Sequence, residues 1–395
     1  MSSSSSSSSS MRDTAKDALK TVQETRDNIV KFAAEAKGGN ITYIAIGICG
    51  VILFSISMWV YSKFGLDDSN CQEMETLYKD FPTISSINFG NDNYKYPLRD
   101  YYVKTAYNAC CSGTFKNDFV NICALKSCIK QGARCLDLGV YSIDGEPVIA
   151  TSSVDNFAVK ETYNSVPFAK VIDVINDYAF SGTACPCPND PVILHLRIMT
   201  NKKEIYSKMA DEIYNKLETR LLGPSYSYEN HGKNLGKMSL SELQGKVIII
   251  VDKSNARFEG TPFDEYVNLA SNSIFMRSIR YTSDVKLTPD SNELKEYNKK
   301  NMTICLPDLS VSPSNPSSLL SMSYGCQFVA MSFQKYDSNM EYYDKLFDKN
   351  NSAFILKEEK LRYIPVTIAA PPKANPMNSY KDRTSTTAAG IKLVI

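Results

Sequence analysis

The sequence predicts an α/β domain, a (β/α)8 or TIM barrel over residues 97–363, behind one membrane-spanning helix. Three observations lead to this fold. Apolar runs of strand length alternate with helical patterns, which is typical of parallel βαβ units. The alternating region has about the ~250 residues that such a barrel needs. Upstream of it, residues 41–61 contain no charged side chain.

Composition limits the classes of function. The 395 residues carry a net charge of +1, so we expect no nucleic-acid partner. Only two residues are His, the usual acid–base side chain at neutral pH, and this scarcity restricts catalysis. Of eleven Cys, ten follow the apolar segment. That even set permits disulfides, and buried free thiols are an equally good interpretation.

The N-terminal region precedes any folded domain. Residues 1–10 are a serine run after the first Met and are predicted to be disordered. Residues 11–39 place apolar side chains near helical spacing, which predicts an amphipathic helix. Such a helix could lie on a membrane or pair with a partner helix. We favour a solvated helix that leads into the apolar segment.

The apolar segment predicts a transmembrane helix from Ile41 to Tyr61. Its 21 residues would reach ~31 Å, the hydrocarbon thickness of a bilayer. Trp59 and Tyr61 lie where interfacial aromatic residues belong. A signal peptide is disfavoured, because the run is too long and too far from the start. We expect a single-pass membrane protein whose lipid partner is the bilayer around this helix.

Basic residues near the helix favour one orientation. Arg26, Lys31 and Lys37 precede it, whereas Lys63 and then Asp67 and Asp68 follow it. The positive-inside bias therefore predicts a cytosolic N-terminus and a lumenal or extracellular barrel. Two glycosylation triplets would be usable on that side, and they are Asn301-Met302-Thr303 and Asn350-Asn351-Ser352.

The remaining elements are read from hydrophobic periodicity. Residues 62–96 are a polar connector, and the tail 364–395 is expected to be an extended arm, because the segment AAPPKAN breaks regular structure. Strands are predicted at residues 101–107, 136–141, 148–150, 191–199, 245–251, 328–333 and 354–356. Helices are predicted at residues 122–131, 168–178 and 203–222.

The stretch from Gly132 to Val148, GARCLDLGVYSIDGEPV, organises this region as strand, tight turn and strand. It resembles the X half of eukaryotic phosphoinositide-specific phospholipase C, which reads roughly GCRCVELD and then DGEPV. Further words resemble that family in the same order. They are PLRDYYV, YAF and PVIL in the X-like half, about residues 97–200, and GCQFVAMSFQ, FILK and LR in the Y-like half, about 245–363.

The resemblance implies a barrel of the phospholipase C-like phosphodiesterase type and its chemistry. That family cleaves a phosphoinositide in two acid–base steps. Two His residues handle the protons, and a Ca²⁺ held by Asn, Glu, Asp and Glu activates the inositol hydroxyl. The two family His positions match Tyr107 and Thr151 here. The sequence therefore provides no confident catalytic residue.

The matching calcium positions are also changed. Asn108 keeps its amide and Asp137 keeps a carboxylate, but the other two ligands are replaced by Gly139 and Arg197. A cation at residue 197 repels Ca²⁺. We therefore predict that calcium binding is lost, with no metal or other cofactor in its place. We hypothesise that Arg197 pairs with Asp137 and occupies the space of the ion.

Several other residues complete the expected vestigial pocket. Ser278 matches a head-group serine, and His195 has the same strand parity as Arg197, so both side chains are expected in the barrel mouth. His231 lies in a polar stretch and is read as a solvated loop residue. We define the vestigial pocket as Asn108, Asp137, Gly139, His195, Arg197 and Ser278.

Two functions compete. The favoured one is a pseudoenzyme, held at a membrane by one helix, that acts as an interaction or structural module with a protein partner. The alternative is a phosphoric diester hydrolase with an altered site, acting on a phosphoinositide or another phospholipid head group. The serine run, single anchor and changed site would suit a large DNA virus or a protist, and the membrane could then be that of a virion.

Overall fold

The computed structural model describes residues 20–31, 39–88, 90–155, 159–228, 234–365 and 382–395. The serine run, His231 and the segment 369–375 lie outside these residues. Of the expected amphipathic helix, the described residues 20–31 are helical. The chain divides into two units, Met1–Arg362 and Tyr363–Ile395.

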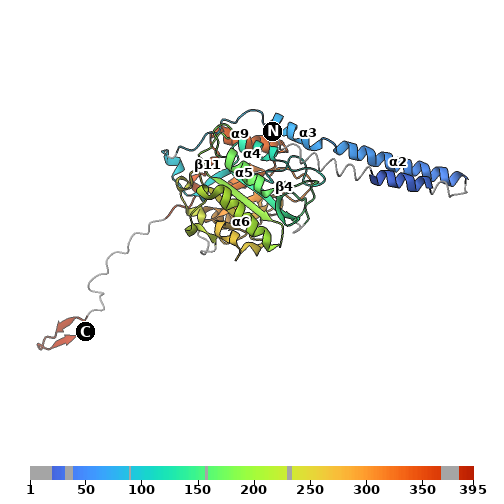
Figure 1. The fold of residues 1–395 in the computed structure, drawn as a ribbon. Helices are drawn as coiled ribbons and strands as arrows, with labels where there is room; N and C mark the ends of the chain where they lie inside the picture. The colour runs from blue at the N-terminus through green and yellow to red at the C-terminus, as the bar shows by residue number, and fades with distance from the viewer. Residues whose placement is uncertain (1–19, 32–38, 89, 156–158, 229–233, 366–381) are drawn as a thin grey trace. The chain divides into compact units, whose positions relative to one another are not determined.

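The first unit contains a nearly closed barrel of eight parallel strands, which confirms the predicted fold class (Figure 1). The hydrogen-bonded order is β7-β6-β5-β2-β1-β10-β9-β8. The strands are β1 (Tyr101–Ala106), β2 (Cys135–Ile143), β5 (Val192–Ile198), β6 (Val247–Asp252), β7 (Leu269–Ser271), β8 (Met276–Arg280), β9 (Met302–Leu306) and β10 (Phe328–Met331).

Three short strands lie beside the barrel. β3 (Glu146–Ile149) returns antiparallel along β2 after the Asp-Gly turn, and β4 (Val166–Pro167) pairs with β3. β11 (Phe354–Leu356) runs antiparallel to β1, so the prediction that 354–356 belongs to the parallel series is wrong. A turn at Asn351, where φ is 49°, follows α9 and brings the chain back to pair with the first residues of β1.

Helices cover the outside of the barrel. They are α4 (Ile122–Lys130), α5 (Phe168–Tyr178), α6 (Lys203–Leu217), α7 (Ser291–Lys300), α8 (Ser318–Ser323) and α9 (Ser338–Lys349). In α5 the fully buried side chains Phe168, Val171, Ile172 and Ile175 fall at positions i, i+3, i+4 and i+7. This spacing forms one apolar face toward the sheet, and α5 has the bounds that the sequence predicts.

The barrel core comes from strands that are buried on both faces. All seven residues of β5 are buried, and so are the first five residues of β6. Such strands lack the alternation of a half-exposed sheet, because helices cover one face and the barrel interior covers the other. The polar residues Asp137, His195 and Arg197 are therefore held in a rigid and largely apolar frame.

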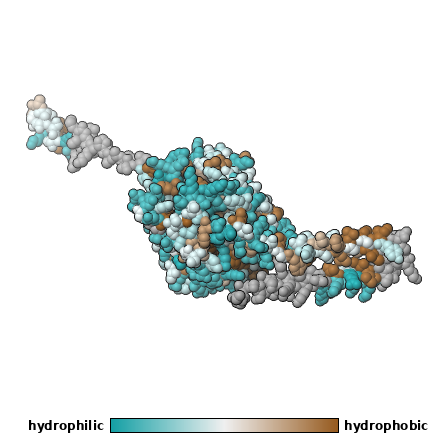
Figure 2. All heavy atoms as spheres, turned by 90° about the horizontal axis from the view of Figure 1, so that it is seen from above, coloured by the Kyte–Doolittle hydropathy of each residue, from teal (hydrophilic) through white to brown (hydrophobic). Residues whose placement is uncertain are grey.

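Two helices lie between the helical residues 20–31 and the barrel. α2 (Gly39–Lys63) and α3 (Leu66–Leu77) are separated by Gly65, whose φ is 78°. Within the described residues, the stretch Tyr43–Leu77 is long and apolar enough to cross a membrane, and none of its apolar window is buried. Figure 2 shows these apolar side chains as exposed surface. α3 lies within residues 62–96, which the sequence analysis describes as a polar connector and for which it predicts no helix.

One disulfide joins Cys71 of α3 to Cys123 of α4. The other eight cysteines after α2 are free and buried. Cys185 and Cys187, which are two residues apart in the loop before β5, are among these eight. Their sulfur atoms lie 3.9 Å apart and accept hydrogen bonds from Arg134.

The second unit ends in a hairpin of β12 (Thr384–Thr386) and β13 (Lys392–Val394). The two strands are connected through Gly390, whose φ of 80° suits a tight turn. The end of the tail is therefore a hairpin, and the prediction of an extended arm is wrong for these residues. The prediction overlooked the turn formed by the residues before Gly390.

Candidate functional site

The candidate site lies at the carboxyl ends of neighbouring barrel strands. In the parallel register of β2 and β5, Asp137 lies beside His195 and Gly139 lies beside Arg197. Residues two apart on a strand point to the same face, so these four positions share the barrel interior. Asn108 follows β1 with a φ of 45°, a conformation that Asn tolerates better than most residues.

Arg197 occupies the centre of this group. Its Nε donates to Asp137 Oδ1 at 2.9 Å, and its Nη2 donates to Asp137 Oδ2 at 2.8 Å and to Asn108 Oδ1 at 2.6 Å. The guanidinium carbon lies 5.0 Å from the centre of the Tyr107 ring. The expected ion pair with Asp137 is therefore present, as a two-pronged contact that also engages the retained amide.

The side chain of Asp137 is fully buried, and burial and the neighbouring charges shift its pKa in opposite directions. Burial alone would raise the pKa of Asp137. The charge of Arg197 and a hydrogen bond from His195 outweigh burial and hold that pKa well below its ordinary value. Asp137 is thus an ionised carboxylate with its charge already matched inside the barrel.

Calcium does not fit these residues. Ca²⁺ takes six to eight oxygen ligands, whereas the oxygens of Asp137 and Asn108 both accept from a cationic side chain. Position 139 also has no room for a calcium-binding side chain, because a Cβ atom there would lie 2.9 Å from the carbonyl oxygen of Ala150. Among the described residues, no group of three His, Cys, Asp or Glu side chains could hold a metal ion.

The two positions of the expected proton carriers hold packed side chains. Tyr107 is buried and its ring stacks edge-on with Phe115, 5.4 Å between centres. Thr151 is buried and its hydroxyl donates to the carbonyl oxygen of Phe115 at 3.2 Å. Neither side chain is an imidazole, the group that changes charge near neutral pH and that the resemblance expects at these two positions.

His195 lies in a hydrogen-bonded chain that sequence analysis did not foresee. Its Nδ1 lies 2.7 Å from Asp137 Oδ1, and its Nε2 lies 2.9 Å from the hydroxyl of Ser271, at the end of β7. The order of groups is that of a Ser–His–Asp triad. However, all three residues are completely buried, so a substrate cannot reach the serine. The chain serves to satisfy buried polar groups.

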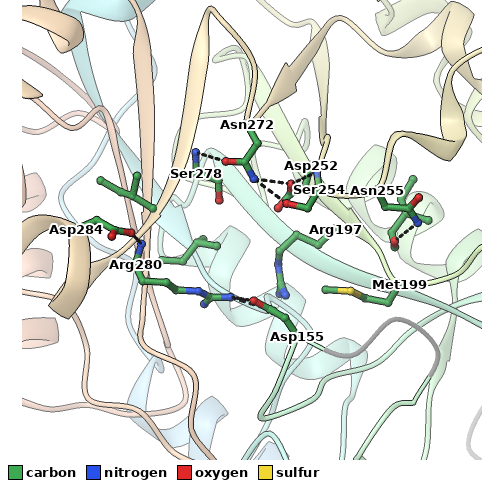
Figure 3. A pocket seen from close by; sticks show the side chains of 13 residues that line it. Asp155, Arg197, Met199, Asp252, Ser254, Asn255, Asn272, Ser278, Arg280 and Asp284 are labelled. Carbon is green, nitrogen blue, oxygen red and sulfur yellow. Dashed lines mark hydrogen bonds and ion pairs between the residues drawn. The ribbon is translucent and has the colours of Figure 1, made fainter.

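A cavity of about 280 Å³ opens above Arg197 (Figure 3). Ser278 lines it, as expected. Arg280, two residues further along β8, donates to both carboxylate oxygens of Asp155 at 3.0 and 2.8 Å and to the carbonyl oxygen of Pro307 at 2.7 Å. Figure 3 shows Arg280 and Asp155 reaching toward each other beside Arg197.

The sequence analysis missed this second ion pair. The strand parity of Ser278 and Arg280 was the available signal, but β8 was not among the predicted strands. Both arginines of the mouth are thus paired with carboxylates of the same chain. Within the described residues, these two pairs neutralise the charges of both arginines, and the cavity is also lined by the carboxylates of Asp252 and Asp284.

Comparisons with known proteins identify the fold. Models of two domains match the chain, described as phosphatidylinositol-specific phospholipase C, X domain, over residues 94–253, and the corresponding Y domain over residues 252–360. The chain is also similar to crystal structures of PLC21 from L. pealei and from S. officinalis, with TM-scores of 0.55 and 0.56.

These structures are distant relatives. Sequence identity is 19% and 20%, and the similarity covers 71% of this chain. The matched region spans only 39% of either PLC21 chain, so the similarity concerns the barrel and not the whole of those proteins. A search of curated proteins found no match. The barrel and its X and Y halves confirm the resemblance seen in the sequence.

Proposed function

We propose that this chain, which belongs to the phosphatidylinositol-specific phospholipase C family through its X and Y domains, is a non-catalytic member held at a membrane. In this role the barrel is an interaction or structural module, and α2 is its anchor. The lipid bilayer is one partner, and a protein that binds the barrel is the second. The family supplies the scaffold, and the residues of the mouth support the loss of catalysis.

The observation that carries this proposal is the position of Arg197. Its guanidinium binds the carboxylate and the amide that remain from the calcium positions. Two unit charges of like sign at ~4 Å cost ~4 kcal/mol at an effective dielectric constant of ~20, and the cost doubles for a divalent ion. To bind here, a Ca²⁺ ion would have to displace Arg197 from Asp137, a buried carboxylate whose charge Arg197 already neutralises.

The rest of the mouth supports the same conclusion. Hydrolysis in this family needs two proton carriers, and positions 107 and 151 hold Tyr and Thr. His195, the one described histidine, is enclosed between Asp137 and Ser271. Because acid–base catalysis requires contact with the reacting atoms, His195 has no access to a substrate in this arrangement.

The alternative, a hydrolase with a rebuilt site, draws on the Ser271–His195–Asp137 chain and on the open cavity above Arg197. It would require the barrel interior to open toward that cavity. The two functions are distinguished by one assay, the release of inositol phosphates from vesicles that contain phosphatidylinositol and its phosphates.

We expect no release above background, with or without Ca²⁺, because Tyr107 and Thr151 occupy the two family His positions and Arg197 binds the remaining calcium-position side chains. The full chain is measured beside an active member of the family in the same vesicles. Arg280→Ala is the matched control for Arg197→Ala, since it removes the other arginine of the mouth. Turnover that His195→Ala or Arg197→Ala abolishes would establish the hydrolase instead.

Membrane anchoring is supported by the exposed apolar surface of α2. We propose that the N-terminus is cytosolic and the barrel lumenal or extracellular. The Cys71–Cys123 disulfide supports this side, since disulfides persist in oxidising compartments. Of the two glycosylation triplets, Asn350 is exposed and Asn301 is half-buried.

We therefore expect a glycan at Asn350 when the full chain is made in cells with a secretory pathway. Peptide N-glycosidase should lower the apparent mass of the wild type but not of the Asn301→Gln/Asn350→Gln double variant. The control is Arg12→Asn, which creates an Asn-Asp-Thr triplet before the membrane helix and should add no glycan. Modification only of the Arg12→Asn site would show the reverse orientation.

A further inference from the structure

A buried arginine links two strands of the candidate site at the end of the barrel opposite the mouth. Arg134 directly precedes β2, and its carbonyl oxygen accepts from the backbone N–H of Ile193, near the start of β5, at 2.7 Å. The side chain of Arg134 is 0% exposed. Because a guanidinium stays protonated in proteins, a buried one requires acceptors and a nearby anion. The partners of Arg134 therefore show where this end of the barrel holds negative charge.

The acceptors of this guanidinium are two sulfur atoms and one carbonyl oxygen. Its Nε donates to Cys187 Sγ at 3.1 Å, its Nη2 donates to Cys185 Sγ, and its Nη1 donates to the carbonyl oxygen of Ala179 at 3.0 Å. Within the part of the chain that the structure describes, these acceptors include no carboxylate. The buried carboxyl of Asp190 accepts from a backbone N–H instead, and burial raises its pKa to about 7. A thiolate is therefore the anion that can meet the guanidinium directly.

Three donors converge on the sulfur of Cys185. Besides Nη2 of Arg134, the backbone N–H of Cys187 donates to it at 3.4 Å, and the thiol of Cys187 lies 3.9 Å away. Hydrogen bonds to the charged form of a group favour that form. The hydrogen bond from the Cys187 thiol and the charge of Arg134 hold the pKa of Cys185 below its ordinary value, whereas burial raises the pKa of Cys187. Cys185 therefore has the surroundings of a thiolate, and Cys187 has those of a thiol.

We propose that Cys185 and Cys187 are a redox-active pair that forms an intramolecular disulfide by thiol–disulfide exchange. Cys185 is the attacking thiolate, and Arg134 is the positioning residue that holds its charge. The co-reactant is a small disulfide of the glutathione class. Because the pair lies at the end of the barrel opposite the mouth, its chemistry does not depend on the proposed loss of catalysis.

The exchange takes two steps. The Cys185 thiolate attacks one sulfur of the external disulfide, forms a mixed disulfide and releases the other half as a thiolate. Cys187 gives its proton to the released thiolate and attacks the Cys185 sulfur, which expels the second half as a thiolate. The pair loses two electrons, and the external disulfide gains them as it becomes one thiol and one thiolate. The two protein sulfurs, which lie 3.9 Å apart, approach to the ~2.05 Å of a disulfide bond.

Two features of the surroundings determine how this pair should react. Its sulfurs are almost fully buried, but the loop that carries them, between α5 and β5, is exposed at Gly182 and Thr183, so a local opening of that loop admits a small disulfide. Arg134 stabilises the reduced form, and a disulfide whose reduced form is stabilised is easily reduced. The pair should therefore exchange with glutathione, whereas the structural Cys71–Cys123 disulfide should resist reduction by it.

Equilibration of the full chain, in detergent micelles, with mixtures of reduced and oxidised glutathione tests the pair. Free thiols are alkylated after an acid quench, and disulfides are assigned by mass spectrometry. We expect a Cys185–Cys187 disulfide that forms in oxidised glutathione and is lost in excess reduced glutathione, while Cys71–Cys123 stays oxidised. Cys187→Ser should stop at a mixed disulfide between Cys185 and glutathione. Two free thiols at every ratio, in buffers that oxidise the same pair in the urea-unfolded chain, would overturn the proposal.

Ultraviolet absorbance of the thiolate tests the charge of the pair without any reagent having to reach it. At pH 7 an ordinary thiol, with a pKa of about 8.5, is mostly protonated. We expect Cys185→Ser/Cys187→Ser to lose the absorbance of one thiolate relative to the wild type, and Cys187→Ser to keep it. The matched control, Cys135→Ser, should equal the wild type, because Cys135 is equally buried and directly follows Arg134, but the described hydrogen bonds of the guanidinium go elsewhere. No loss in the double variant would overturn the role given to Arg134.

Discussion

Replacing Arg197 with alanine is expected to lower the free energy of unfolding by about 3–5 kcal/mol, the cost of leaving one partner of a buried ion pair uncompensated. The variant leaves the Asp137 carboxyl in the barrel interior without its cationic partner, with only the His195 ring and the backbone N–H of Asn108 as polar partners. It also removes the guanidinium from the Tyr107 ring. Urea unfolding of the full chain in detergent micelles measures the difference.

The matched control is Arg277→Ala. Arg277 makes an equally well-aligned pair with Glu293, at 2.9 and 2.7 Å, but both side chains are well exposed. Exposed pairs contribute about 0–1 kcal/mol, so this variant should unfold almost like the wild type. Equal losses in the free energy of unfolding of Arg197→Ala and Arg277→Ala would contradict the claim that Arg197 stabilises the fold through a buried ion pair.

The pH dependence separates a lost charge partner from lost packing. In the wild type, the lowered pKa of Asp137 gives stability that is present above the unfolded pKa of about 4 and is lost as the pH falls through the folded value. Without Arg197, burial acts to raise that pKa, so the native variant binds a proton that the unfolded chain has lost. The penalty of Arg197→Ala should therefore be smaller near pH 4 than at pH 7.

Removing both cysteines of the Cys71–Cys123 disulfide is expected to cost about 4 kcal/mol, because the bond closes a loop across a sequence separation of 52 residues in the unfolded chain. The contacts of α3 with Asp118 and Asn121 remain in the Cys71→Ser/Cys123→Ser variant. The expected change is thus a loss of stability without a loss of the fold, seen as a lower urea midpoint.

A reductant provides the internal control for this prediction. The eight other cysteines after α2 are free, so a reductant should destabilise the wild type to the level of the double variant. It should leave the double variant unchanged. A wild type that is insensitive to a reductant that reaches the protein would show that the bond is not formed or does not stabilise the barrel.

The sequence predicted the parts of the barrel with strong periodicity. α5 has the predicted bounds because its apolar residues repeat with helical spacing, and β5 is recognisable as a continuous apolar run. β7, β8 and β9 were missed because they are three to five residues long, and β8 contains two arginines and a serine. Short strands of this kind take their conformation from hydrogen bonds to neighbouring strands.

The site likewise contains contacts that the sequence predicted and contacts that it did not. The pair of Asp137 and Arg197 was predictable, because strand parity placed both side chains in the barrel mouth. The partners Ser271 and Asp155 were not predictable, since each lies more than 70 residues from the side chain that it contacts. Contacts between ends of distant strands and loops depend on barrel closure, and no local pattern in the sequence encodes them.

The fold and the site of this chain depend on different residues. The barrel depends on apolar strands and covering helices, whereas family chemistry depends on a few polar residues at the strand ends. A mouth that balances its own charges, with Arg197 on Asp137 and Arg280 on Asp155, needs no bound ion to offset buried carboxylates. On the proposal that calcium binding is lost, this self-neutralisation explains how the scaffold stays stable without the ion.

Calorimetric titration of the full chain with Ca²⁺, in detergent micelles, tests the central claim most directly. If the Arg197 guanidinium fills the position of the ion, the wild type should give no saturable heat at millimolar Ca²⁺, and Asp137→Asn should give the same trace. Saturable binding at millimolar or lower concentration, abolished by Asp137→Asn, would contradict the claim.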